Sequence, residues 1–93
     1  MAGTTEQPCW LCGRPLGGRV EHHHTVPKSR GGRETVAVHP ICHRTLHRTF
    51  SNAELGVFGA SVAAIRADPR IGRFLNWIER KDPDFHAPTH RGR

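Results

Sequence analysis

The 93-residue chain carries 14 Lys and Arg against 8 Asp and Glu, a formal net charge of +6, and only 35% of its residues are hydrophobic. This length allows one domain with a limited core, so we expect no large apolar ligand cavity, and a bound metal would add stability. No stretch reaches the roughly 18 apolar residues that span a bilayer, and the polar N-terminus lacks the apolar segment of a secretory signal. We therefore expect a cytoplasmic protein with no membrane partner. Its charge suits a polyanion such as nucleic acid, although a solvated surface is the simpler alternative.

The first half of the chain predicts a turn, two strands and a helix. A Cys-x2-Cys turn comes first, and runs rich in β-branched residues follow it. Pro40 ends the second run and precedes a helical pattern. The expected elements are a flexible tail over 1–8, a knuckle-type turn over 9–13, strands over 19–24 and 35–38 joined by a basic loop over 27–32, and a helix over 41–50.

Two further helices are expected in the second half. Ser51 and Glu54 have the spacing of a capping box, which predicts a helix reaching about residue 66. Asp68-Pro69 predicts the start of a last helix that ends near residue 80. Their apolar faces should pack on the core or form a dimer surface, so a monomer or weak homodimer is expected. These apolar positions are Leu55, Phe58, Val62, Ile65, Phe74, Leu75, Trp77 and Ile78. Residues 81–93 are predicted to be an extended or disordered basic tail.

Three cysteines and one histidine have the spacing of a four-ligand metal site. Cys9 and Cys12 form one pair, and His39 with Cys42 forms a second pair of the same spacing. Ligands two residues apart close a chelate turn around tetrahedral zinc. An odd number of cysteines argues against a disulfide framework. We therefore predict a structural zinc. The alternatives are a redox Cys-x2-Cys pair, or a surface His39 beside a buried Cys42 thiol.

A second histidine group suggests a reaction centre. His43 and His47 are four residues apart, which places both imidazoles on one face of the expected helix. His23 and His24 lie at the end of the first expected strand, where neighbouring side chains can diverge. One can ligate an ion while the next activates water. The alternatives are an exposed basic helix face, or a one-residue slip that makes His22 and His23 the working pair.

Together these motifs resemble the HNH endonucleases, the ββα-metal nucleases. The resemblance covers residues 9–50, roughly half the chain, including the zinc knuckle. It rests on His23-His24-Thr25-Val26-Pro27, the Gly31-Gly32 loop, the strand over 35–38 and Cys42-His43-Arg44-Thr45-Leu46-His47. It implies an α+β fold with a ββα-metal core over 9–50 and an N-terminal zinc knuckle. In a single domain over 9–80, two additional C-terminal helices over 51–80 would support that core.

The resemblance also implies roles for individual residues. His24 matches the general base, and His23, His43 and His47 match the ligands of a catalytic ion in the all-histidine arrangement of the colicin-type nucleases. Neutral imidazoles suit Zn, Ni, Co or Mn, whereas Mg prefers oxygen ligands. The expected cofactors are therefore a structural Zn and one catalytic divalent ion, Zn, Ni, Mn, Co or Mg. Glu34 stands at the position of the family's Asn and could orient His24.

The implied function is a metal-dependent DNA endonuclease. His24 would activate water, and the histidine-bound ion would stabilise the scissile phosphate of double-stranded DNA. Glu34 cannot donate a hydrogen bond as Asn does. The main alternative is therefore a catalytically inactive, zinc-dependent DNA-binding module, and a third is a scaffold protein that stores metal. The residues expected to contact DNA phosphates are Lys28, Arg30, Arg33, Arg44 and Arg48.

Overall fold

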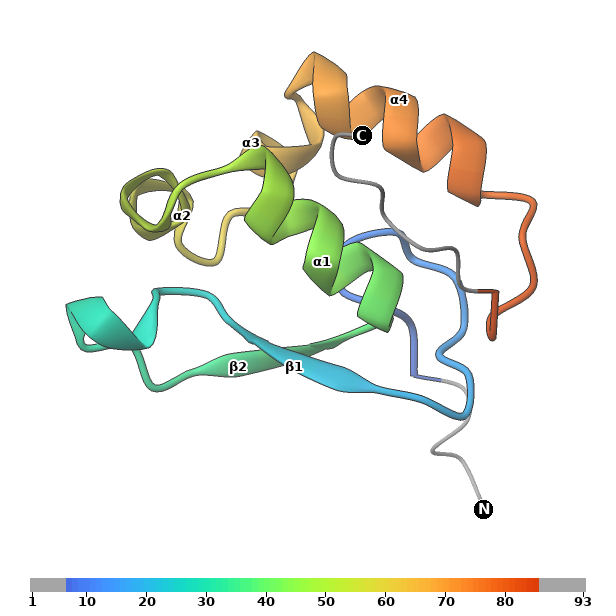
Figure 1. Cartoon of the computed structure of the whole chain (residues 1–93), viewed down its shortest axis with the longest axis horizontal. Helices are drawn as coiled ribbons and strands as arrows, with labels where there is room; N and C mark the ends of the chain where they lie inside the picture. The colour runs from blue at the N-terminus through green and yellow to red at the C-terminus, as the bar shows by residue number, and fades with distance from the viewer. Residues whose placement is uncertain (1–6, 86–93) are drawn as a thin grey trace.

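An antiparallel hairpin carries the first part of the candidate site. The computed structural model describes residues 7–85 (Figure 1), in which a two-stranded sheet is followed by four α-helices. Strands β1 (Glu21–His24) and β2 (Thr35–Val38) pair so that Glu21 lies opposite Val38 and His24 opposite Thr35. The second strand has the predicted bounds, and the first begins two residues later than predicted. The α+β class is confirmed.

Helix α1 (Pro40–Thr49) packs along the hairpin, as Figure 1 shows. Pro40 occupies the first helical turn, where its missing N–H leaves no helical hydrogen bond unmade. Successive side chains of a strand point to opposite faces of the sheet. His23 and Val38 are accordingly buried beneath α1, whereas His22 is exposed.

The loop between the strands is compact because its backbone folds onto Pro27. The Pro27 carbonyl accepts hydrogen bonds from the N–H groups of Arg30, at 2.8 Å, and Gly32, at 3.2 Å. The first of these closes the 3-10 helix η2 (Lys28–Arg30). A Cβ atom at position 32 would collide with the Val26 carbonyl, so only glycine fits there. This folded loop continues directly from the strand end that carries His24.

Within residues 7–85, three helices follow α1, so the prediction of two was wrong. The expected helix over 53–66 is divided into α2 (Asn52–Phe58) and α3 (Val62–Arg66). Gly59 adopts φ 55° and ψ −129°, a conformation that ends α2 and that a side chain would oppose. The Ser61 hydroxyl then accepts a hydrogen bond from the Ala64 N–H and starts a new helix. Helix α4 (Pro69–Ile78) completes the set.

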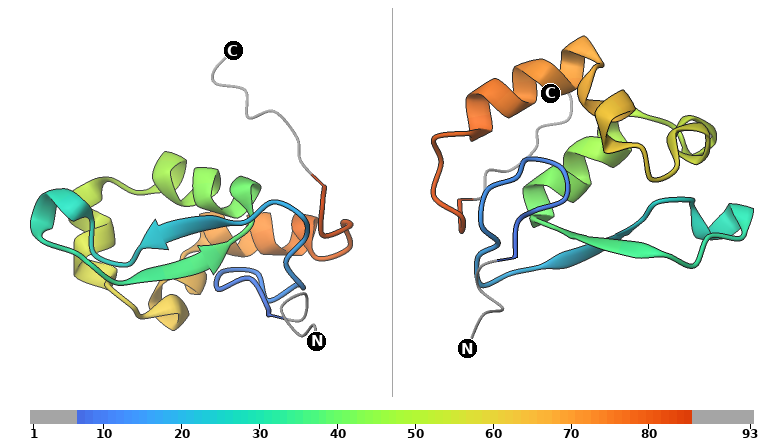
Figure 2. Two further views of the ribbon diagram at one scale, coloured as in Figure 1. Left: turned by 90° about the horizontal axis from the view of Figure 1, so that it is seen from below. Right: turned by 180° about the vertical axis from the view of Figure 1, so that it is seen from behind.

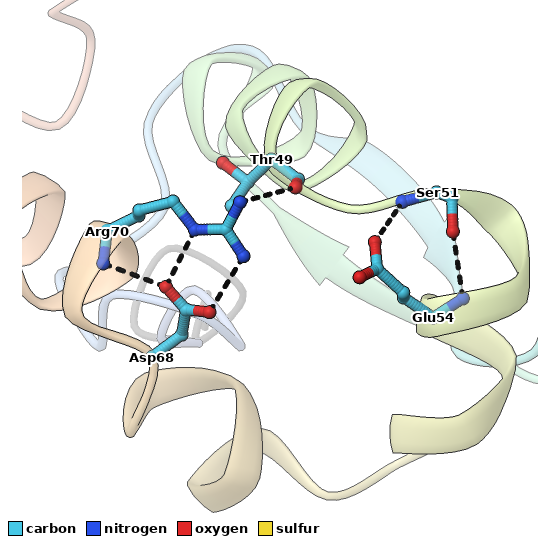
Figure 3. A network of polar contacts seen from close by, with 5 residues as sticks. All are labelled: Thr49, Ser51, Glu54, Asp68 and Arg70. Carbon is cyan, nitrogen blue, oxygen red and sulfur yellow. Dashed lines mark hydrogen bonds and ion pairs between the residues drawn. The ribbon is translucent and has the colours of Figure 1, made fainter.

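Side chains cap helices α2 and α4 at their N-termini (Figure 3). The Ser51 hydroxyl accepts from the Glu54 N–H at 3.1 Å, and the Glu54 carboxylate accepts from the Ser51 N–H at 2.8 Å, as the capping-box prediction required. Asp68 caps α4 and pairs with Arg70, whose hydrogen bond lowers the pKa of Asp68 to about 2. Arg70 also donates to the Thr49 carbonyl at 3.3 Å. The end of α1 is therefore tied to the start of α4.

The core lies between α1, the N-terminal segment and the later helices. Most of the predicted apolar positions are buried or half-buried, but Trp77 is 47% exposed and packs beside Phe74 and Phe85 at the surface. The fully buried side chains of the core include Leu11, Leu46, Leu55, Ile65, Ile71 and Ile78. Within residues 7–85, no helix has the length and hydropathy needed to cross a membrane.

Residues 81–85 return to the N-terminal segment, which Figure 2 shows from behind. The Arg14 guanidinium donates to the carbonyls of Lys81, at 2.6 Å, and Asp82, at 2.8 Å. This part of the predicted tail is therefore a packed turn, and residues 7 and 8 likewise belong to the fold through a bridge between Pro8 and Pro15. The remainder of both predicted tails, 1–6 and 86–93, lies outside the described residues.

Removing the capping box should destabilise the domain. We expect Ser51→Ala to lower the free energy of unfolding by about 1 kcal/mol, because the Glu54 N–H loses its acceptor. Urea denaturation followed by circular dichroism measures this change. Ser29→Ala is the matched control, since that exposed serine caps no helix. Equal losses in the two variants would contradict the capping role.

Candidate functional site

The predicted sulfur-containing ligand set comes together in the structure. The Sγ atoms of Cys9, Cys12 and Cys42 and a ring nitrogen of His39 all lie within 4.8 Å of one another. Cys9, Cys42 and His39 are buried, and Cys12 is half-buried. These four residues are therefore close enough to hold a metal ion. Three thiols with one imidazole make a donor set that fits tetrahedral zinc.

The orientation of His39 suits a ligand. Its Nε2 lies 2.9 Å from the Pro15 carbonyl oxygen, which can only accept, so Nε2 carries the proton. The unprotonated Nδ1 then faces the sulfur atoms of Cys12 and Cys42, at 3.4 and 3.8 Å. Such an outer hydrogen bond selects the tautomer and fixes the ring plane of a metal-binding histidine. His39 is 1% exposed, so the surface alternative was wrong.

The three thiols compete for one negative charge. Hydrogen bonds from Cys12 and then Cys42 lower the pKa of Cys9 far below its ordinary value. The same contacts, from Cys12 and then Cys9, together with burial, raise the pKa of Cys42. A divalent cation would remove this competition, because metal binding favours the thiolate form at every sulfur ligand.

The sulfur cluster lies at the start of α1. His39 is the residue before α1, and Cys42 lies in the first turn of the helix. The knuckle is held by its own backbone, through a hydrogen bond from the Cys9 N–H to the Arg14 carbonyl at 2.9 Å. The Trp10 N–H donates to the Ala37 carbonyl at 2.9 Å, which ties the knuckle to β2. The knuckle therefore contacts both the hairpin and the start of α1.

A second ligand set lies between β1 and α1. Ring nitrogens of His23, His43 and His47 lie within 4.8 Å of one another. Their ring centroids are 4.9 to 5.5 Å apart and meet edge to face. His22 is exposed on the other face of the strand. The structure therefore favours His23 as the ligand and argues against the alternative in which His22 and His23 are the working pair. His24, half-buried at the end of β1, does not belong to this group.

His23 is a buried imidazole with no polar partner. It is 1% exposed, and within the described residues neither of its ring nitrogens has a hydrogen-bond partner. Burial, followed by the charges of His47 and His43, lowers the pKa of His23 to about 4. Burial and His43 also lower the pKa of His47. Both imidazoles are therefore neutral near pH 7, the form that binds a metal, and an ion would satisfy an otherwise orphaned nitrogen.

Glu21 orients His43 and was not identified from the sequence. Its carboxylate accepts from the His43 Nδ1–H at 2.8 Å, which leaves Nε2 free to bind an ion. A carboxylate behind a ligating histidine fixes the ring and raises its basicity. The available signal was the period of the strand, because Glu21 lies two residues before His23 and so shares its face.

Glu34 does not brace His24 through its side chain. Glu34 is exposed, and among residues 7–85 no hydrogen bond involves its carboxylate. Its backbone carbonyl instead accepts from the Thr25 N–H at 3.2 Å and closes the hairpin beside His24. The five cations expected to contact DNA are all exposed, and they lie on the hairpin loop and on α1. They are Lys28, Arg30, Arg33, Arg44 and Arg48.

Comparison with known proteins finds a relative that aligns with most of this chain. The uncharacterized protein YisB of Bacillus subtilis (strain 168) is 38% identical over 85 residues, which cover 89% of this chain and 84% of YisB. The chain belongs to the YisB family. No family model matches the chain, and no solved structure matches it.

The buried His23 gives this YisB-family protein an acid-sensitive element. With no divalent ion added, we compare the free energy of unfolding of the wild type with that of His23→Leu. We expect the wild-type value to fall more than the variant's as the pH decreases from about 6.5 to about 4. In that pH range His23 is protonated in the unfolded chain but stays neutral in the folded protein. The total loss should approach about 3 kcal/mol, from the 1.36 kcal/mol that each pKa unit represents.

Urea unfolding at stepped pH measures this difference. The exposed His22 provides a control, because His22→Leu should leave the pH dependence of the wild type in place. Parallel pH profiles for the wild type and His23→Leu would contradict the assignment.

Proposed function

We propose that this protein is a metal-dependent DNA endonuclease of the HNH type. The observation that carries the proposal is the meeting of His23, from the hairpin, with His43 and His47, from α1, within 4.8 Å. A strand and a helix that hold three imidazoles beside a fourth histidine, His24, are the parts that such a site requires. The exposed cations on the loop and α1 support DNA as the substrate.

We further propose that the sulfur cluster holds a structural zinc. Four protein ligands close the coordination sphere, as structural sites require, and leave no position for substrate. The burial of Cys9, Cys42 and His39 supports a structural role for this ion. The hydrogen bond from His39 to Pro15 supports a site built in advance for a metal.

His23, His43 and His47 would hold the catalytic divalent ion. With three protein ligands, positions stay open for substrate. When bound, this ion supplies Lewis acidity to the scissile phosphate and the departing oxygen. The buried imidazole of His23 resists protonation, and Glu21 holds His43 in the tautomer with a free Nε2.

His24 would be the general base of the reaction. As a neutral imidazole it takes a proton from the water that attacks phosphorus. His24 directly follows His23 at the end of β1, and the hydrogen bond between Thr25 and Glu34 steadies the backbone that follows it. The exposed loop cations would neutralise neighbouring phosphates and orient the strand.

A DNA-binding module without catalysis is the second candidate. The exposed Glu34 carboxylate, which makes no hydrogen bond within the described residues, favours this alternative. If the protein is an endonuclease, the backbone hydrogen bond between Thr25 and Glu34 would hold the general base His24 in place of the Glu34 side chain. The two candidates differ in whether supercoiled DNA is cut.

Plasmid nicking in a series of Mg, Mn, Ni, Co and Zn decides between them. We expect the wild type to nick supercoiled DNA with at least one ion, and His24→Ala to cut roughly 10²- to 10⁴-fold more slowly, because the general base is lost. His22→Ala, at an exposed neighbouring position, is the matched control and should cut like the wild type. Binding of duplex DNA with no nicking in any ion would instead establish the inactive module.

Metal analysis of variants separates the two sites. We expect Cys42→Ser to lose the zinc and cooperative unfolding together, because zinc binding in small domains supplies on the order of 10 kcal/mol of folding free energy. His47→Ala should keep the zinc and the fold while losing the second ion. Replacing the zinc by cobalt checks which residues bind it. The sulfur-to-cobalt absorption bands should be present in His47→Ala, because its cysteine ligands are unchanged. A folded Cys42→Ser variant with a full complement of zinc would refute the structural site.

A further inference from the structure

A polar groove lies directly beside the histidine cluster. It has a volume of about 450 Å³ and runs between the segment before β1 and the start of α1. It is lined by Gly18, Arg19, Val20, Glu21, Pro40 and Arg44. Glu21 connects it to the cluster through the 2.8 Å hydrogen bond from His43, and Arg44 follows His43 in α1. A substrate held at the histidines would therefore extend into this groove.

Two arginines give the groove a positive charge. Arg19 and Arg44 are exposed and come from different elements. Neither forms an ion pair within residues 7–85, where the ion pairs are His43–Glu21 and Arg70–Asp68. Glu21 is the single carboxylate among the lining residues, and His43 already engages it. The guanidinium fork matches the oxygens of a phosphate, so two free arginines favour an anionic phosphate here.

The chain in front of Arg19 is held in place. The Gly18 N–H donates to the Asp84 carboxylate at 2.6 Å, and Asp84 belongs to the turn that packs on the N-terminal segment. A Cβ atom at Gly17 would collide with the same carboxylate, so the two segments are in close contact. Asp84 and Arg19 line a smaller neighbouring pocket without forming an ion pair. The backbone before Arg19 is therefore held in place, while the Arg19 guanidinium forms no ion pair within the described residues.

We propose that Arg19 and Arg44 bind the phosphate next to the scissile one. This inference rests on the proposed endonuclease function and adds a specificity to it. The preferred substrate would be a strand that continues past the cut on the side of the groove, rather than an isolated phosphodiester. Arg19 would act as a positioning residue that never touches the reacting atoms. It was not among the cations expected from the sequence.

DNA binding is the first test. With a short labelled duplex, Arg19→Gln should weaken binding roughly tenfold, the usual effect of losing a charge-assisted hydrogen bond. It should also reduce the slope of log affinity against log salt by about 1, because one phosphate contact is lost. Arg73→Gln is the matched control, an exposed arginine of α4 outside the groove, and should behave like the wild type. Unchanged affinity and slope in Arg19→Gln would overturn the proposal.

Cleavage of two substrates is the second test. Bis(p-nitrophenyl) phosphate has one phosphate and no neighbour, so Arg19→Gln should hydrolyse it within about twofold of the wild-type rate while plasmid nicking falls roughly tenfold. Equal losses on both substrates would overturn the proposal, because Arg19 would then act on the reaction centre or the fold. If the wild type cuts neither substrate, the endonuclease function fails, and the duplex-binding result alone decides whether Arg19 contacts phosphate.

Discussion

The contact between the N-terminal knuckle and the first turn of α1 is the constraint on which the rest of the structure depends. Cys9 and Cys12 come from the knuckle, His39 is the residue between β2 and α1, and Cys42 lies in the first turn of α1. A domain of 93 residues has a limited core, so a shared ion at this junction would replace much of the packing that a larger protein provides. Since His43 directly follows Cys42, the same junction sets the position of the candidate reaction centre.

The histidine cluster places a polar group where the fold would otherwise bury an apolar one. An unpartnered polar group in a protein interior costs about 1 to 3 kcal/mol. His23 lies beneath α1 with both ring nitrogens unpartnered within the described residues. A leucine at this position would pack without that cost. The arrangement is understandable if the neutral imidazole is needed as a ligand, and the carboxylate of Glu21 behind His43 serves the same requirement.

The positive charges are spread along the site rather than gathered at one point. Arg30 and its neighbours lie on the hairpin loop, beyond the end of β1. Arg19 and Arg44 lie at the opposite end, before β1 and near the start of α1. The histidine cluster is between these two groups, because it joins the middle of β1 to α1. Under the proposed endonuclease function, the two groups would hold a nucleic-acid strand on both sides of the reacting phosphate.

Local patterns were enough to predict those features that depend on neighbouring residues. The spacing of Cys9 with Cys12 and of His43 with His47, the bounds of β2 and the cap at Ser51 all follow from helical or strand periods and from turn chemistry. The prediction failed within the segment over 53–66, where the apolar period continued although Gly59 and Ser61 end one helix and begin another. A regular apolar pattern does not reveal such a break.

The tertiary structure alone decided the contacts between segments far apart in the chain. The Pro15 carbonyl that orients His39, the return of residues 81–85 to Arg14, and the groove shared by Arg19 and Arg44 have no signature in the linear sequence. The sequence by itself determined which residues can bind metal and on which face of their own element they lie. Only the folded chain decided which of them meet, because hydrogen bonds and burial between distant segments depend on how whole elements pack.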